Sequence, residues 1–188
     1  IIISVLMPLM LQAFAANAAA YAQGGYGALV FYPVALFGAL ATCGGSGNTL
    51  PLVIFGLKAK SEQIRAVSKI ALVPGWFGIN EPVTFGMPIM YNPILCIPYV
   101  LNVIVVMACT LFMYKIGFLV PGFVPIMTLM PMGFGAFLST LRWQNAIWDY
   151  LTMIPAGLVW YPFFKLYDNQ LYKKEQEAKA AEEAAAKA

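Results

Sequence analysis

The pattern of hydrophobic and polar positions divides the chain into long apolar runs with short polar interruptions. Residues 28–42 are apolar, whereas residues 13–27 before them are small and mildly polar, which is typical of a loop or an interfacial helix. Residues 93–114 contain no charge over 22 positions and form the clearest span, because a helix needs about 20 apolar residues to cross a bilayer. The pattern therefore predicts an all-α polytopic membrane protein.

Two further apolar stretches are interrupted by Gly and Pro and are expected to be re-entrant hairpins. They cover residues 70–92 and 118–141, and neither arm of the first is long enough to cross alone. Residues 58–69 hold four basic residues and one acid, so we expect a short amphipathic helix on the cytoplasmic side. If both hairpins return to the side they left, the basic tail after residue 172 also becomes cytoplasmic.

The C-terminal part combines an apolar helix with a charged tail. Residues 150–164 complete a last helix that starts near Gln144 and ends in an aromatic and basic belt at residues 160–165. Beyond it the sequence is mostly Ala, Glu and Lys, the composition of a solvated helix. We therefore expect a membrane-embedded domain over residues 1–172 and a cytoplasmic helical tail over residues 173–188.

Composition supports the membrane assignment and excludes several kinds of site. The 188 residues are 61% hydrophobic and 10% charged, against about 25% charged in soluble domains. A net charge of +3, without basic patches that carry aromatics, does not indicate nucleic-acid binding. The chain has no His, and Cys43, Cys96 and Cys109 lack metal-ligand spacing. We expect no metal and no cofactor.

One carboxylate stands alone in the apolar background. Glu81 is the only charged residue between Lys69 and Lys115. A charge at membrane depth costs about 2.5–3.5 kcal/mol on insertion scales, so it normally faces a cavity and serves a function. Pro82 and the flanking glycines interrupt a helix. The sequence predicts a non-helical tip that presents Asn80 and Glu81 to a polar cavity; the alternative is a surface loop with Glu81 in water.

A second polar interruption covers residues 43–51, Cys-Gly-Gly-Ser-Gly-Asn-Thr-Leu-Pro. It predicts a broken helix in which Ser46 or Asn48 caps the next half-helix. Such a helix start offers free backbone N–H groups to a polar ligand. A tight turn between two short helices is the alternative.

Several runs, in order, resemble one known family. The run Gly-Ile-Asn-Glu-Pro-Val at 78–83, Gly-Gly-Ser-Gly-Asn-Thr-Leu at 44–50 and Tyr-Pro-Phe-Phe-Lys-Leu-Tyr-Asp at 161–168 are similar to the EIIC membrane permease of the bacterial sugar phosphotransferase system. The similarity is greatest to the lactose/cellobiose/diacetylchitobiose branch, and it covers the chain up to about residue 172.

The resemblance implies the C-terminal, transport half of a multi-pass permease in the bacterial cytoplasmic membrane, with a cytoplasmic C-terminus. It implies that a sugar, expected to be a disaccharide, receives phosphate from a phosphocysteine of a partner EIIB subunit. The permease would be a homodimer through an N-terminal half that this chain lacks. The family's His-Gly motif would lie just before Ile1, so we expect the fragment alone to be inactive, and its enzymatic role is left open.

The chemistry of the candidate residues suggests a role for each in such a permease. Glu81 would accept hydrogen bonds from sugar hydroxyls and act as general base for the phosphorylated hydroxyl. Trp143 would stack on a pyranose ring, with an interface anchor as the alternative. The other substrate-binding candidates are Asn80, Ser46, Gly47 and Asn48.

Two other functions fit parts of the pattern. An ion- or proton-coupled secondary transporter would use Glu81 as its coupling carboxylate. A membrane scaffold without transport would leave both Glu81 and the glycine-rich interruption unexplained.

Overall fold

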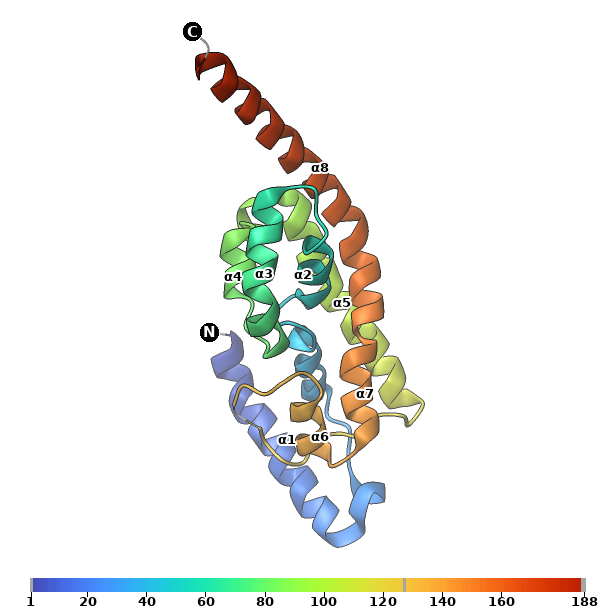
Figure 1. Ribbon diagram of the computed structural model, residues 1–188. Coiled ribbons are helices and arrows are strands. Elements are labelled where there is room, and N and C mark those ends of the chain that lie inside the picture. Colours follow the sequence, from blue (N-terminus) through green and yellow to red (C-terminus); the bar gives the residue numbers. More distant parts are fainter. Residues whose placement is uncertain (1, 127, 187–188) are drawn as a thin grey trace.

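The protein is all-helical, as predicted. A computed structural model describes residues 2–126 and 128–186, and no strand occurs among them. Its elements (Figure 1) are the α-helices α1 (Ile2–Gly24), α2 (Leu50–Gly56), α3 (Glu62–Trp76), α4 (Glu81–Gly86), α5 (Pro93–Lys115), α6 (Phe134–Thr140), α7 (Trp143–Leu151) and α8 (Met153–Ala186), and the 3-10 helices η1 (Gly25–Ala28), η2 (Pro33–Ala41) and η3 (Ile89–Tyr91).

The long helices α5 and α8 pack side by side and form the axis of the molecule (Figure 1). The Asn102 side chain donates to the Ala156 carbonyl at 3.1 Å. Near the other end of α5, Trp148 Nε1 of α7 donates to Thr110 Oγ1 at 3.1 Å. The first bond links α5 to α8 and the second links α5 to α7, and both are buried, where an unpaired donor would be costly.

Helix α5 alone is long and apolar enough to cross a membrane by itself among the described residues. A second span results only if the bent pair Leu6–Ala28 and Pro33–Ala41, which meets at 91°, is counted as one. The predicted re-entrant hairpins are therefore not established by helix length and composition.

The first predicted hairpin has a longer first arm than expected. The amphipathic helix expected at residues 58–69 is not a separate element, because α3 runs without a break from Glu62 to Trp76. Ser61 caps it by accepting from the Ile64 N–H at 3.2 Å. The first proline inside α3 is Pro74, in its last turn, so nothing interrupts the helix earlier. Helix α4 returns alongside α3 (Figure 1).

The second predicted hairpin, residues 118–141, has one helical arm instead of two. Its first part is irregular up to Gly133, apart from Met127, which lies outside the described residues. Prolines at 121, 125 and 131 explain this, since each lacks the N–H that a helix requires. The N–H groups of Phe123 and Val124 donate to the Ser139 carbonyl at 3.0 and 3.1 Å. The first part of the segment and its last helix therefore lie side by side.

Two other boundaries differ from the prediction. Helix α1 includes most of residues 13–27, for which a loop or an interfacial helix was predicted, because the run of alanines there favours helix strongly. The last helix is split at Thr152 into α7 and α8. Helix α8 then continues into the exposed tail as one helix of 34 residues.

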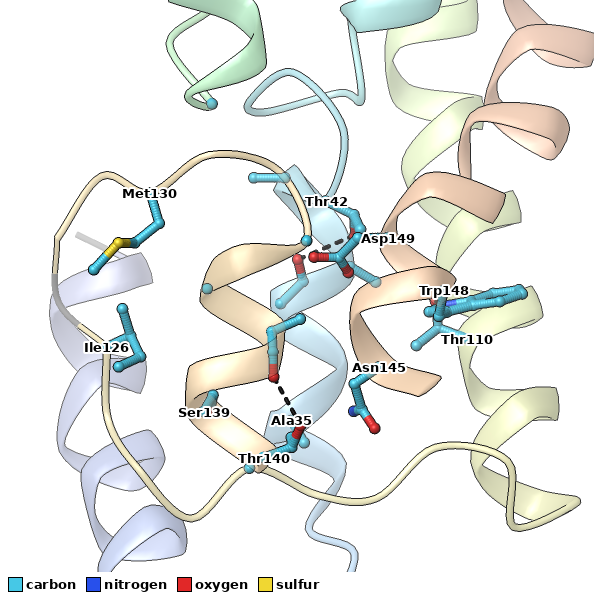
Figure 2. A pocket seen from close by; sticks show the side chains of 18 of the residues that line it. Ala35, Thr42, Thr110, Ile126, Met130, Ser139, Thr140, Asn145, Trp148 and Asp149 are labelled. Carbon is cyan, nitrogen blue, oxygen red and sulfur yellow. Dashed lines mark hydrogen bonds between the residues drawn. The ribbon is translucent and has the colours of Figure 1, made fainter. Parts of the chain in front are cut away.

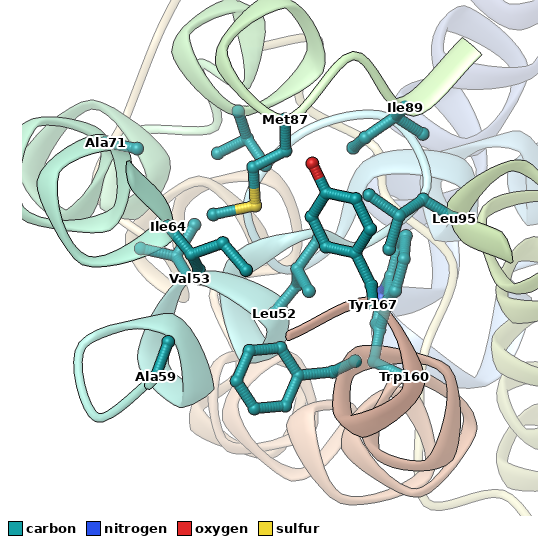
Figure 3. Close-up of a cluster of buried hydrophobic side chains, with 12 residues drawn as sticks. Leu52, Val53, Ala59, Ile64, Ala71, Met87, Ile89, Leu95, Trp160 and Tyr167 are labelled. Carbon is teal, nitrogen blue, oxygen red and sulfur yellow. The ribbon is translucent and has the colours of Figure 1, made fainter. Parts of the chain in front are cut away.

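A buried apolar cluster joins α2, α3, α5 and α8 (Figure 3). Its largest fully buried side chain is Trp160 of α8. The Trp160 indole N–H donates to the carbonyls of Gly47 and Asn48, at 3.3 and 3.0 Å. The glycine-rich segment before α2 is thereby fixed to the axis of the molecule.

At the end of the molecule away from α6, two side chains of α8 accept hydrogen bonds at the start of α3, in addition to the cap by Ser61. The Asp168 carboxylate accepts from the N–H groups of Lys60 and Ser61, each at 3.0 Å. Glu175 accepts from Ser61 Oγ at 2.6 Å and from the N–H of Glu62 at 3.0 Å. Two carboxylates therefore lie at the positive end of the α3 dipole, where negative charge is stabilising.

Candidate functional site

The glycine-rich segment, residues 43–49, is a tight non-helical break between η2 and α2. Gly44, Gly45 and Gly47 have φ values of 83°, 76° and 77°, and Asn48 has 51°. Glycine adopts these left-handed conformations without steric cost. The sequence suggested that Ser46 or Asn48 caps α2, but neither residue does so. The capping position is Thr49, whose hydroxyl instead donates to the Gly44 carbonyl at 2.6 Å.

Asn48 is fully buried and holds this break together. Its Oδ1 accepts from the Cys43 N–H at 3.0 Å, and its Nδ2 donates to the Ala39 carbonyl at 3.1 Å. Both ends of the amide are thus occupied by backbone. Ser46, another predicted site residue in the break, is exposed.

The Asn80–Glu81 tip lies against this break. Helix α3 ends at Trp76, and Gly78 follows with φ of 82°, the usual left-handed glycine after a helix end. The Asn80 Nδ2 then donates to the Ser46 carbonyl at 2.7 Å. A Cβ on Gly45 would lie 2.6 Å from the Gly78 carbonyl oxygen. The structure therefore brings together two segments 34 residues apart in sequence.

The tip is narrower than the sequence predicted. Only residues 77–80 are non-helical, and Glu81 already begins α4. Pro82 does not prevent this helix because it occupies the first turn, where an N–H has no partner inside the helix. Glu81 is exposed, and in the part of the chain that the structure describes its side chain has no hydrogen bond or ion pair.

A cavity of about 490 Å³ adjoins the tip and the break (Figure 2). One wall contains Thr42, Gly44 of the break and residues 76–78, where α3 ends and the tip begins. The opposite wall comes from α6, α7 and the irregular segment before α6, and Figure 2 shows Asp149 directed into this region from α7. None of the predicted site residues lines the cavity itself.

Trp143 lies apart from the other candidates. It begins α7, and 61% of its surface is exposed. Its neighbour Arg142 lies over the Tyr26 ring, with the guanidinium carbon 4.4 Å from the ring centroid. This is a cation–π contact between the starts of α7 and η1. The structure does not place Trp143 beside Asn80 and Glu81.

Sequence reasoning did not single out Asp149 or Thr42. A signal was present for Asp149, because it is a carboxylate within the apolar stretch between Trp143 and Phe164. Thr42 has no such signal, since a threonine at the end of an apolar run is unremarkable. Across residues 2–126 and 128–186, no three His, Cys, Asp or Glu side chains are grouped to hold a metal ion.

Comparison with known proteins identifies the family. The profile of the family described as "Phosphotransferase system, EIIC" matches residues 1–103. The chain is 32% identical over 97% of its length to the lichenan permease IIC component of Bacillus subtilis, of which it covers 41%. It is 35% identical over 90% of its length to the lactose-specific EIICB component of Lacticaseibacillus casei, of which it covers 30%.

A solved structure has the same fold. The crystal structure of the transporter ChbC, the IIC component of an N,N′-diacetylchitobiose-specific phosphotransferase system, superimposes with a TM-score of 0.83 and 31% identity. The match covers 93% of this chain and 41% of that one. The chain thus spans about two fifths of the length of ChbC and of the lichenan permease component, and 30% of the lactose-specific EIICB component. The resemblance seen in the sequence is confirmed: the chain belongs to the EIIC family of phosphotransferase-system sugar permeases, which are integral membrane proteins.

Proposed function

We propose that this chain forms the sugar-binding and translocating part of an EIIC permease in the bacterial cytoplasmic membrane. The observation that carries the proposal is the bond between Asn80 and the Ser46 carbonyl, 2.7 Å long, which holds the two broken segments together beside a cavity. Paired broken segments of this kind are the common form of a binding site inside a transporter.

The substrate is proposed to be a disaccharide that binds at the Asn80–Glu81 tip. Asn80 keeps its Oδ1 and one N–H for a ligand after donating to Ser46. Glu81 offers a carboxylate without a competing partner in the described part of the chain. Charge-assisted hydrogen bonds from sugar hydroxyls to a carboxylate are stronger than neutral ones.

The proposed reaction is phosphoryl transfer from a phosphocysteine of an EIIB partner. The sugar hydroxyl attacks phosphorus, the new O–P bond forms, and the P–S bond breaks with release of the cysteine thiolate. Glu81 accepts the hydroxyl proton as general base. The exposure of Glu81 supports this role, because EIIB must reach the sugar. We further propose that the whole permease is a homodimer through residues outside this chain.

Replacement of Glu81 tests the proposal in the full-length permease. Glu81→Gln retains size but removes the charge and the base. We expect sugar affinity to fall about 10- to 150-fold, which corresponds to the 1.5–3 kcal/mol of a charged hydrogen bond. Calorimetric binding of lactose, N,N′-diacetylchitobiose and oligo-β-mannosides, together with phosphorylation by phospho-EIIB, measures both roles.

Glu177→Gln is the matched control, since it removes a carboxylate from the exposed part of α8. Wild-type affinity and phosphorylation in Glu81→Gln would reject the role of Glu81. Uptake that needs an ion gradient and no phospho-EIIB would instead support the secondary-transporter alternative.

A further inference from the structure

A second carboxylate lies inside the apolar body of the protein, on α7. Asp149 lines the cavity beside the break (Figure 2). Its neighbours on α7 have structural partners: Asn145 bonds both the N–H and the carbonyl of Val120, and Trp148 bonds Thr110. Asn145 and Trp148 line the same cavity, and Asp149 differs from them in carrying a carboxyl group rather than a neutral side chain.

The structure offers Asp149 little compensation within the protein. The ion pair found among the described residues, Lys179 with Glu62, lies on the tail. The backbone N–H of Gly133 and the side chains of Tyr114 and Cys43 lie near the Asp149 carboxyl. None of these three groups is a cation, and the two carboxyl oxygens can accept several hydrogen bonds. An ionisable side chain within a membrane domain that lines a cavity and lacks a charged partner typically marks a substrate path.

The cavity links Asp149 to the proposed site. Its opposite wall includes Thr42 and residues 76–78, and only Ile79 separates the latter from Asn80 and Glu81 in the sequence. The volume of about 490 Å³ falls in the range of roughly 300–1,000 Å³ typical of small-molecule sites. Aromatic rings of Tyr32 and Trp76 form apolar parts of its lining.

We propose that Asp149 is a second sugar-contacting carboxyl group, which binds a hydroxyl of the same sugar that Glu81 contacts. A sugar carries hydroxyl donors around its rim, and carboxyl oxygens accept from them. One acceptor on the tip and another on α7 would select a sugar by the positions of two hydroxyls. The inference rests on the proposed function and adds a specificity-determining residue to it.

Monodeoxy sugars test this contact in the full-length permease. Wild type and Asp149→Ala are titrated with lactose or N,N′-diacetylchitobiose, whichever binds, and with its monodeoxy analogues. We expect Asp149→Ala to lose roughly tenfold or more in affinity for the parent sugar. For the analogue that lacks the contacted hydroxyl, wild type and variant should bind equally. Asp149→Asn, which keeps an acceptor oxygen, should lose less.

The outcomes separate this inference from the function on which it rests. Unchanged affinity in Asp149→Ala overturns the inference and leaves the proposed function intact. An equal loss for the parent sugar and for every analogue also overturns it, because a purely structural role would weaken all ligands alike. If the wild-type permease binds none of the sugars, both are overturned. Glu177→Gln again controls for removal of one negative charge.

Discussion

At the scale of single residues, the site depends on how little space separates the break from the tip. Gly45 has no side chain, and a Cβ at this position would lie 2.6 Å from the Gly78 carbonyl oxygen and 3.0 Å from the Asn80 side chain. Its φ of 76° is also strained for any other residue. Glycine at this position therefore permits the Asn80–Ser46 hydrogen bond.

Gly45→Ala should separate the two segments and impair sugar binding. The left-handed backbone alone costs a non-glycine residue about 1–3 kcal/mol, and the clash with a backbone oxygen adds to it. We expect at least a tenfold loss of sugar affinity with membrane insertion retained, measured by binding to purified full-length permease.

Gly117→Ala is a matched control for this change. Gly117 has the same φ of 76°, but a Cβ there would meet no atom within 4 Å. Equal effects of the two variants would mean that backbone strain, and not the contact with Gly78, accounts for the loss.

The site could be predicted from sequence only as far as unusual residues stand out from their background. Asn80 and Glu81 stand out because they are polar among apolar neighbours, although neither lines the cavity beside them. Asn48 looks the same in sequence, yet both of its amide ends bond the backbone of the break. Composition cannot distinguish an amide that holds a turn from one that faces a ligand, since the partner lies elsewhere in the chain.

At the scale of elements, α3 depends on a helix more than 100 residues later in the chain. Its first turn is capped by Asp168 and Glu175 of α8, in addition to Ser61. Desolvation acts to raise the pKa of Glu175, but hydrogen bonds from Ser61 and the backbone, and the charge of Lys179, together lower it. The carboxylate form is thus the one that stabilises the cap.

This predicts an acid-sensitive attachment between α3 and α8. A group with a lowered pKa contributes fully above its ordinary value, 4.5 for this carboxyl, and the contribution is lost as pH falls through its lowered value. Protection factors of the amides of residues 62–64, obtained by hydrogen exchange, should therefore decrease below about pH 4.5. Glu175→Gln should lower them already at pH 7.

Glu177→Gln provides the comparison at pH 7, because Glu177 is exposed on the same helix. If amide protection at the start of α3 is the same in wild type and Glu175→Gln, the cap does not stabilise α3.

Element boundaries were predicted well where local signals dominate and poorly where they do not. Helix α5 matches its apolar run because 22 uncharged residues leave few alternatives. The continuity of α3 was missed because its first half is charged and its second half apolar, although a helix tolerates both. The irregular stretches at 118–126 and 128–133 follow from their prolines, whereas the same Gly and Pro positions had predicted a hairpin with two short arms.

At the scale of the whole molecule, the hydrogen bonds between residues 60–63 and α8 place these segments at one end. Gly117, just after α5, lies beyond the far end of that helix. We propose that the end with residues 60–63 and the tail faces the cytoplasm, as their basic residues indicate.

Single cysteines test this topology in a full-length permease whose native cysteines have been replaced. Lys60→Cys and Lys173→Cys should react with a membrane-impermeant reagent from the cytoplasmic side, and Gly117→Cys from the opposite side. All three positions are exposed. Labelling of Lys60→Cys and Lys173→Cys from opposite sides would contradict the arrangement.

The overall fold and family were accessible from sequence because several family-like runs occur in order along the chain. The number of membrane crossings was not, since only α5 has the length and apolarity of a simple span among the described residues. The bent arrangement of α1 and η2 and the broken helices depend on packing between segments, which no local pattern encodes.

The remote cap of α3 also has a consequence for biosynthesis. Asp168 lies 107 residues after Ser61, and a ribosome adds about 5–20 residues per second. The start of α3 therefore waits about 5–20 s for its distant carboxylates while the chain is still being made. During that interval only Ser61 and water can satisfy the first N–H groups of α3. The helix that leads to the Asn80–Glu81 tip is therefore fully stabilised only after α8 has been made.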